Sequence, residues 1–298
     1  MQESDWIQRY IAPLVTASGA DALRDDVALL STPSAMIATM DTLVEGVHFL
    51  ASDPLGTVGQ KLVRVNVSDV YAKGALPHEA LLSIAWPRDR DETQFAALMN
   101  GLARDLAVFN TSLIGGDLVS TDGPLTLTLT LTGRCLNAGP VRRSGGQAGQ
   151  GLYVSGKLGW GGLGLAAARA GEASRATDRY RVPEIASESI AQTVATVASA
   201  SMDVSDGLLI DALRLAKASE CGVHLALETI PLAAPAEDAD SILSQCTSGD
   251  DYCVLIAADG EQSVPGFVKI GELTESQGLA LALNGRSINA PSTLGFEH

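Results

Sequence analysis

Apolar and polar positions along the chain form short segments of helical or strand periodicity, separated by turns rich in Gly, Pro and Asp. In the first half, apolar residues at helical spacing predict helices over residues 4–15, 57–75 and 92–110. Gly74 suits the C-cap of the second of these helices. Apolar runs, or alternation with a period of two, predict strands over residues 34–44, 79–87, 111–117 and 125–135. The last strand alternates Leu with Thr, so its Thr-bearing face is expected to pack against a semi-polar surface.

The second half begins after a glycine-rich, basic stretch over residues 137–151, which is the best candidate for a domain boundary. The pattern then predicts helices over residues 162–171 and 187–199, a polar loop over 172–184, a strand, turn and helix over 201–222, and strands over 151–156, 223–228, 251–258 and 266–273. A chain of 298 residues is longer than one hydrophobic core usually serves. We therefore predict two α/β domains, residues 1–138 and residues 139–298.

Composition and charge narrow the functional class. A hydrophobic fraction of 46% indicates a globular protein, and a net charge of −15 disfavours binding to nucleic acid or an anionic membrane, because phosphate groups would be repelled. The N-terminus lacks the pattern of a signal peptide, and no apolar run reaches the roughly 20 residues that span a bilayer, so a cytoplasmic location is expected. Cys135, Cys221, Cys246 and Cys253 are scattered, which favours reduced, buried thiols over zinc ligands or disulfides.

Nine aspartates stand where an apolar run meets a tight turn: Asp25, Asp26, Asp41, Asp69, Asp117, Asp203, Asp206, Asp250 and Asp251. Any one of them could cap a helix or a turn, because an Asp side chain accepts hydrogen bonds from backbone N–H groups. That explanation does not account for the acid pairs that recur beside glycines. Grouped carboxylates repel one another unless a cation binds them, and Mg²⁺ prefers a few hard oxygen ligands completed by water and phosphate oxygens. The set therefore predicts a magnesium site for phosphate chemistry.

Other segments bear on how a phosphate group could bind. The glycine pair ending at Gly116 stands directly before Asp117, where backbone amides can approach a phosphate, and Arg142 with Arg143 could clamp one. Residues 159–164 match G-x-G-x-x-G after a predicted strand, but no second strand ending in an acid follows. We interpret this match as a structural turn between a strand and a helix. No G-x-x-x-x-G-K-[ST] motif occurs, so a phosphate site here is not a P-loop.

Several blocks together resemble the thiamine-monophosphate kinases, within the superfamily of aminoimidazole ribonucleotide synthetase-like enzymes. The blocks are DDVALL, MDTLVEGVHF, KLVRVNVSDVYAKGALP, LIGGD, RRSGGQAGQGLYVSGKLG, DVSDGLLIDALRLAKASECGV, SGDDYCVLIA and GFEH, in family order across nearly the whole chain. The resemblance implies a two-domain α/β fold whose N-terminal sheet domain pairs with its copy in a homodimer. It also implies direct, Mg²⁺-assisted transfer of the γ-phosphoryl group of ATP to thiamine monophosphate.

The resemblance further implies roles for individual residues. The implied Mg²⁺ ligands are Asp26, Thr39, Asp41, Asp69, Asp117, Asp203 and Asp206. The implied ATP contacts are Gly116, Asp117, Arg143 and Ser205. The implied contacts to thiamine phosphate are His48, Asp250 and Phe296.

Some positions depart from the family pattern, and other functions remain open. Arg24 stands where the family usually has Gly, Met40 where it has Thr, Asp250 where it has Glu, and Phe296 where it has Trp or Tyr. We expect these changes to alter substrate affinity. The alternatives are another ATP-dependent enzyme of the superfamily or a non-catalytic nucleotide- or thiamine-phosphate-binding protein. A selenophosphate synthetase is disfavoured because its reactive Cys lies near the N-terminus, whereas the first Cys here is Cys135.

Overall fold

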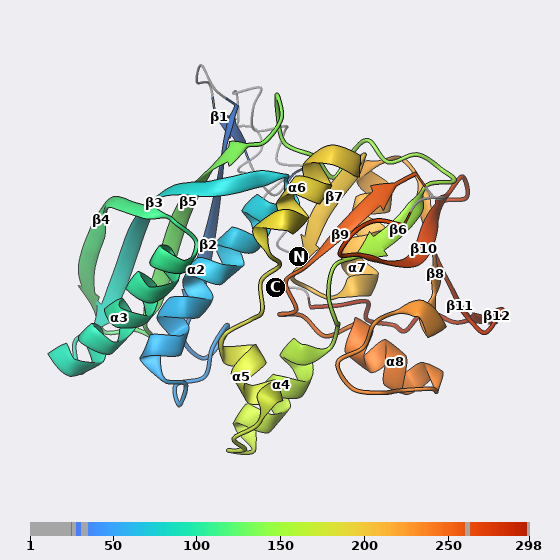
Figure 1. Cartoon of the computed structure of the whole chain (residues 1–298). Coiled ribbons are helices and arrows are strands. Elements are labelled where there is room, and N and C mark those ends of the chain that lie inside the picture. The colour runs from blue at the N-terminus through green and yellow to red at the C-terminus, as the bar shows by residue number, and fades with distance from the viewer. Residues whose placement is uncertain (1–24, 26–27, 31–34, 260–262, 297–298) are drawn as a thin grey trace.

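The computed structural model describes residues 25, 28–30, 35–259 and 263–296. The helix predicted over residues 4–15 lies outside the described residues, as do Arg24 and Asp26. The described chain forms two α/β regions, each built on one sheet, with helix α2 (Leu55–Ala72) lying between them (Figure 1). Within the described part of the chain, no helix is both long and apolar enough to cross a membrane.

The N-terminal region is a five-stranded sheet in the order β1, β2, β5, β3, β4. Its strands are β1 (Ala28–Leu30), β2 (Met36–Val44), β3 (Ala75–Pro87), β4 (Ser112–Thr121) and β5 (Thr126–Cys135). Neighbouring strands are antiparallel except β3 and β4, which run parallel. Helices α2 and α3 (Glu92–Val108) pack together on one face of the sheet (Figure 1). The strands and helices predicted over this part are confirmed; β1 was not predicted, because three residues show no period.

Glycines allow α2 and α3 to approach closely. A Cβ atom at Gly101 of α3 would lie 1.8 Å from the carbonyl oxygen of Gly56, and one at Gly59 of α2 would lie 2.4 Å from that of Leu98. Both distances are far inside van der Waals contact, so larger residues would force the helices apart. This tight packing fixes the position of α2, which carries several residues of the site described below.

The two faces of the N-terminal sheet differ in what covers them. On β5, Leu127, Leu129 and Leu131 are fully buried, as the alternation of Leu with Thr predicts. The opposite face bears the Thr side chains, and their cross-strand neighbours Met40 and Leu81 are 63% and 46% exposed. Strand β4 is exposed along nearly all its length. An apolar sheet face of this kind is typical of a surface that another protein covers.

The C-terminal region is a seven-stranded sheet in the order β12, β11, β8, β10, β6, β9, β7. Its strands are β6 (Gly151–Val154), β7 (Ala200–Val204), β8 (Gly222–Ala226), β9 (Cys253–Ala258), β10 (Val268–Thr274), β11 (Leu279–Leu283) and β12 (Arg286–Ile288). Its helices are α4 (Trp160–Arg169), α5 (Arg175–Arg181), α6 (Glu188–Val197), α7 (Leu208–Ala218) and α8 (Ala239–Cys246), with a 3₁₀ turn over Leu227–Thr229. The pairing is antiparallel except between β8 and β11.

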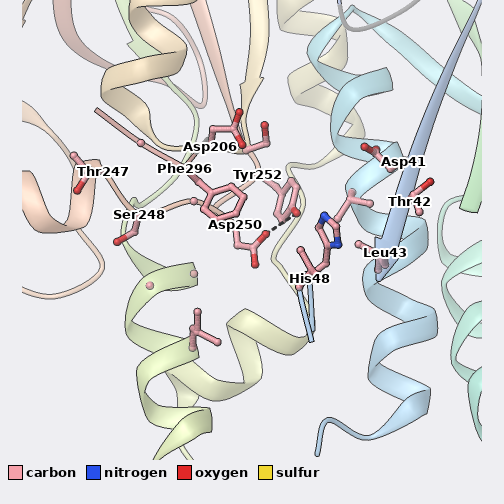
Figure 2. A pocket seen from close by; sticks show the side chains of 18 residues that line it. Asp41, Thr42, Leu43, His48, Asp206, Thr247, Ser248, Asp250, Tyr252 and Phe296 are labelled. Carbon is pink, nitrogen blue, oxygen red and sulfur yellow. Dashed lines mark hydrogen bonds between the residues drawn. The ribbon is translucent and has the colours of Figure 1, made fainter. Parts of the chain in front are cut away.

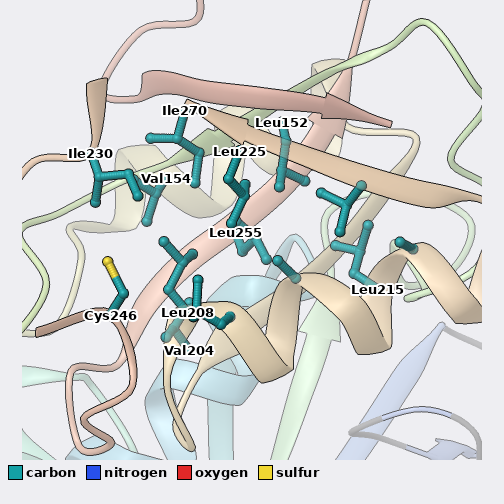
Figure 3. Packing of buried hydrophobic residues seen from close by; sticks show 14 of the residues in the cluster. Leu152, Val154, Val204, Leu208, Leu215, Leu225, Ile230, Cys246, Leu255 and Ile270 are labelled. Carbon is teal, nitrogen blue, oxygen red and sulfur yellow. The ribbon is translucent and has the colours of Figure 1, made fainter. Parts of the chain in front are cut away.

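The main C-terminal core lies between this sheet and α7 (Figure 3). Leu152 of β6, Leu255 of β9 and Leu225 of β8 meet Leu208 and Leu215 of α7 there, and all five are fully buried. The packing holds the end of β7 and the start of α7 rigidly against the sheet. The turn between these two elements carries part of the site.

The loop predicted over residues 172–184 is wrong, because α5 forms within it. Its side chains are mostly polar, which hides a helical period, but Ser174 caps the helix by accepting a hydrogen bond from the Thr177 backbone N–H at 3.2 Å. Tyr180 of α5 is buried, and its ring lies 4.5 Å from Nζ of Lys61. The short helix is therefore stabilised by its cap and by tertiary contacts rather than by an apolar stripe.

Candidate functional site

Two adjoining cavities lie where α2 and the N-terminal sheet meet the C-terminal region. The smaller has a volume of about 230 Å³ and the larger about 460 Å³. The residues that line both are Asp41, Val65, Ser205 and Tyr252. Of the thirteen site residues named from the sequence, ten line one or both cavities: Thr39, Asp41, His48, Asp69, Arg143, Asp203, Ser205, Asp206, Asp250 and Phe296.

The smaller cavity holds three aspartates from three different elements. Asp41 lies on β2, Asp69 on α2 and Asp203 on β7. Thr39 lies on the same face of β2 as Asp41, and its hydroxyl donates to Asp69 at 2.5 Å. The hydroxyl of Ser68 donates to Asp203 Oδ2 at 2.7 Å. The fold thus converges carboxylates that are far apart in sequence, as the acid pattern predicted.

The carboxyl groups of this cluster have strongly raised pKa values. Burial raises the pKa of Asp41 to about 6 and that of Asp203 to about 7. Burial raises the pKa of Asp69 well above its usual range, and the charges of Asp203 and Asp41 raise it further. The hydrogen bonds from hydroxyl groups oppose this rise only in part. A divalent cation between these groups would favour their ionised forms, since opposite charge lowers a carboxyl pKa.

A buried lysine of the protein lies beside the cluster. Lys73 is fully buried, its Nζ lies 2.7 Å from Asp25, and it donates to the carbonyl oxygen of Ser201 at 2.6 Å. The charges of Asp69 and Asp203 also act on this ammonium group. Sequence analysis did not single out Lys73, because a lysine next to a helix end is usually exposed.

The donor atoms around the smaller cavity fit Mg²⁺ rather than a softer metal, because they are carboxylate and hydroxyl oxygens. Across the residues that the structure describes, no group of three His, Cys, Asp or Glu side chains forms a complete metal site. Mg²⁺ usually takes one or two protein carboxylates and completes its octahedron with water and substrate phosphates. The residues therefore fit an ion that binds together with a phosphorylated substrate.

A loop between β7 and α7 carries Ser205 and Asp206. Their backbone N–H groups both donate to Oδ2 of the buried Asp211 at 3.1 Å, so Asp211 shapes this loop. Arg214 forms ion pairs with Asp206 and Asp211. Arg143 lines the smaller cavity; burial lowers its pKa, but a guanidinium group remains charged at neutral pH and can bind a phosphate oxygen.

The larger cavity brings together His48, Asp250 and Phe296 (Figure 2). The Nδ1 atom of His48 accepts a hydrogen bond from the backbone N–H of Val44 at 3.0 Å. Phe296 is 49% exposed, and its backbone N–H donates to the carbonyl oxygen of Asp206 at 2.9 Å, which anchors the C-terminal segment at the cavity. The ring of Phe296 thus presents an aromatic surface to a ligand.

Two residues that sequence analysis missed hold the carboxylate of Asp250. Nζ of Lys61 lies 2.8 Å from Oδ2. The hydroxyl of Tyr252 donates to Oδ1 at 2.8 Å (Figure 2). Lys61 is only 1% exposed and also donates to the carbonyl oxygen of His48 at 3.1 Å. A usable signal existed, because Lys61 lies two helical turns before Asp69 and hence on the same face of α2.

Gly116 and Asp117 lie apart from both cavities. A row of cross-strand partners leads from β2 to β4 through Thr42, Thr128, Ser83 and Asp117. Three strand spacings place Asp117 roughly 14 Å from Thr42, on the uncovered face of the sheet. Within one chain, the structure does not bring Asp117 to the acid cluster.

The glycine turn over residues 159–164 holds a carboxylate of the protein itself. The backbone N–H groups of Gly159 and Gly161 donate to Asp251 at 2.7 Å and 3.1 Å. A Cβ atom at Gly161 would lie 2.0 Å from the carbonyl oxygen of Gly249, so close packing also requires a glycine there. The match is a turn between β6 and α4, as interpreted from the sequence, and Gly161 and Gly162 also line the larger cavity.

Comparison with known proteins matches both halves of the chain. Residues 24–135 match the AIR synthase related protein, N-terminal domain, and residues 147–284 match the AIR synthase related protein, C-terminal domain. The chain is 37% identical to the thiamine-monophosphate kinase of Caulobacter vibrioides (strain ATCC 19089 / CIP 103742 / CB 15), over 99% of this chain and 90% of that protein. It is 32% identical to the thiamine-monophosphate kinase of Escherichia coli (strain K12), over 92% and 90% of the two chains.

The structure is also similar to a solved structure described as "AaThiL complexed with AMPPCP and TMP". The TM-score is 0.88 at 27% sequence identity, and the match covers 100% of this chain and 97% of that chain. The similarity therefore extends over both sheets and the cavities between them.

Proposed function

Because this chain belongs to the thiamine-monophosphate kinase family, we propose that it transfers the γ-phosphoryl group of ATP to thiamine monophosphate, yielding thiamine diphosphate and ADP. The observation that carries the proposal is the junction of the two cavities. An acid-lined cavity suited to cation-bound phosphates opens onto a larger one with an aromatic ring, and such a junction can hold a donor and an acceptor at once.

The smaller cavity is the proposed site of phosphoryl transfer. We assign Asp41, Asp69 and Asp203 to Mg²⁺ binding. Asp26, Thr39 and Asp206 are proposed as further ligands, although Asp206 would have to share its carboxylate with Arg214. When bound, Mg²⁺ neutralises phosphate charge and screens the repulsion between donor and acceptor phosphates.

Arg143 and Ser205 are proposed to bind phosphate oxygens of the nucleotide. Both line the smaller cavity, and the backbone N–H of Ser205 is held by Asp211, so the loop and the Ser205 hydroxyl are positioned before substrate arrives. Phosphoryl transfer depends mainly on positioning and charge neutralisation. The attacking atom is a phosphate oxygen of the acceptor, so no nucleophilic side chain or strong general base is needed.

The larger cavity is the proposed site for thiamine monophosphate. Phe296 offers a face for a flat, cationic ring, and His48 can contact the acceptor from the opposite wall. The carboxylate of Asp250 is already paired with Lys61, so its negative charge is partly balanced before substrate binds. We propose that Lys61 positions Asp250 and the backbone of His48, and thereby sets the shape of this cavity.

We also propose that the protein acts as a homodimer in the cytoplasm. The exposed apolar residues on the outer face of the N-terminal sheet support pairing with a second copy. Gly116 and Asp117 lie on β4, and three strand spacings place Asp117 about 14 Å from Thr42, the neighbour of Asp41. In the dimer, we propose that Asp117 contributes to the nucleotide site of the partner subunit.

The direct test incubates the purified protein with ATP, Mg²⁺ and thiamine monophosphate and separates the products by chromatography. We expect equal amounts of thiamine diphosphate and ADP, and neither in the absence of the acceptor. The matched control is Asp41→Asn, which keeps the shape of the side chain but removes its charge. Binding of ATP without thiamine diphosphate formation would instead indicate a non-catalytic binding protein or a different acceptor.

A further inference from the structure

A third cavity lies between α2, α3 and α5, lined in part by a group of arginines. Its volume is about 500 Å³, and four of its nine lining residues are Arg64, Arg104, Arg179 and Arg181. Asp178 is the acid in this lining. The chain has 20 Lys and Arg against 35 Asp and Glu, so a gathering of four guanidinium groups runs against its overall charge.

This arginine cavity is separate from the two cavities described above. Gln60 and Arg64, one helical turn apart, line it from one face of α2. Lys61 and Asp69 lie on a neighbouring face of the same helix and contact the proposed kinase site. The lining residues of the arginine cavity include none of those that line the other two.

Two of the arginines are held in place by buried acids. Nε of Arg64 lies 2.5 Å from Asp105, and Nε of Arg181 lies 2.8 Å from Asp53; both aspartates are buried. These pairs orient the planar guanidinium groups. The terminal nitrogens of Arg181 form no hydrogen bond with any residue that the structure describes, so they are available to a ligand.

The other two arginines are less restrained. Arg104 is exposed and forms neither an ion pair nor a hydrogen bond within the described chain. Arg179 pairs with Glu184 at 2.5 Å, but that glutamate is 67% exposed, so a ligand can compete with it. Together with their acid partners, the four arginines are close to neutral. Directional N–H donors, rather than net charge, would therefore carry the binding of an anion.

We propose that the arginine cavity binds a compound with a diphosphate group. Guanidinium groups from three helices surround it, and a guanidinium fork matches the oxygens of a phosphate group with paired hydrogen bonds. The volume is larger than one phosphate group requires and falls in the range of small-molecule sites. The diphosphate could be free or part of a nucleotide.

The test measures binding of inorganic pyrophosphate to the full-length protein by calorimetry in the presence of a chelator. Without divalent cations, the acid cluster repels anions, so binding should report the arginine cavity. We expect binding that Arg104→Gln and Arg179→Gln each weaken about tenfold or more, the effect of losing one charge-assisted hydrogen bond. Neither change leaves a buried acid unpaired, so both variants should fold.

Two controls locate the binding. Arg169→Gln removes an equal charge outside the cavity lining and should leave the affinity unchanged, and so should Arg143→Gln in the proposed kinase site. The proposal is overturned if pyrophosphate does not bind, if Arg104→Gln and Arg179→Gln both bind as tightly as the wild type, or if Arg143→Gln alone abolishes binding. Displacement of pyrophosphate by a nucleoside diphosphate would identify a nucleotide as the source, and no displacement would identify the free diphosphate.

Discussion

A dimer in which Asp117 serves the partner's site predicts that two inactive variants restore each other. Asp41→Asn removes a carboxylate from the chain's own acid cluster, and Asp117→Asn removes one from β4. Strand spacing places Asp117 roughly 14 Å from Thr42, the neighbour of Asp41, which is too far for both to bind one ion. Each homodimeric variant should lose roughly 100-fold or more in turnover, as expected when a charge-stabilising group is removed from an active site.

In a heterodimer of the two variants, the altered groups fall together in one site. The other site then keeps both carboxylates. We therefore expect purified heterodimers to recover about half of the wild-type turnover, because one of the two equivalent sites is intact. Co-expression with two different affinity tags, followed by purification on both, yields the heterodimers for a coupled assay of ADP release.

The matched control is a heterodimer of Asp41→Asn and Asp203→Asn. Both residues belong to the same cluster, so each of its two sites lacks one group and turnover should stay low. The reasoning is refuted if heterodimers of Asp41→Asn and Asp117→Asn are no more active than the parent homodimers. It is equally refuted if no doubly tagged species forms.

Three further predictions test single features of the site. Asp69→Asn should raise the thermal unfolding temperature in chelator, and more at pH 8 than at pH 5. Folding raises the pKa of this carboxyl group, so the wild type loses about 1.4 kcal/mol of stability per pH unit as the pH rises toward the folded pKa. A lower unfolding temperature for the variant than for the wild type at pH 8 would contradict this. Lys61→Met unpairs Asp250, so it should lower the free energy of unfolding in urea by about 2 kcal/mol. It should also raise the KM for thiamine monophosphate more than the KM for ATP, and equal changes in both KM values would argue against a positioning role. Phe296→Ala should raise the KM for thiamine monophosphate several-fold, because it removes the aromatic face offered to the ligand. Unfolding in urea should be unchanged, since Phe296 is 49% exposed, and a parallel loss of stability would show that the ring is structural.

Much of the fold was predictable from the sequence because periodicity and burial coincide. On β5, every Leu of the alternating run faces the helices and every Thr faces outward. The grouping of acids was predicted from their recurrence beside turns, but their positions were not: Asp41 lies within β2 and Asp69 within α2. The sequence alone could not give the distances between them.

Long-range pairs were not predictable in this way. Lys61 and Asp250 are 189 positions apart, and nothing local to either residue indicates the other. Met40 lines the smaller cavity, but strand alternation turns its side chain toward the outer sheet face, where it is 63% exposed. We therefore expect Met40 to affect both the smaller cavity and the surface proposed to pair with a second copy.

The carboxylates of the site fall into two groups, those that form an ion pair with a Lys or Arg of the chain and those that do not. Asp250 pairs with Lys61 and Asp206 with Arg214, so resident cations balance both. In contrast, Asp41, Asp69 and Asp203 form no ion pair with any Lys or Arg that the structure describes, although burial disfavours their charged forms. The charges of Lys73 and Arg143 act on the cluster, but Lys73 is paired with Asp25, and the pKa values of Asp69 and Asp203 stay raised. An exchangeable cation would supply the counter-charge that these crowded carboxylates lack. We therefore expect Asp206, which already has a cationic partner, to contribute least to binding that cation.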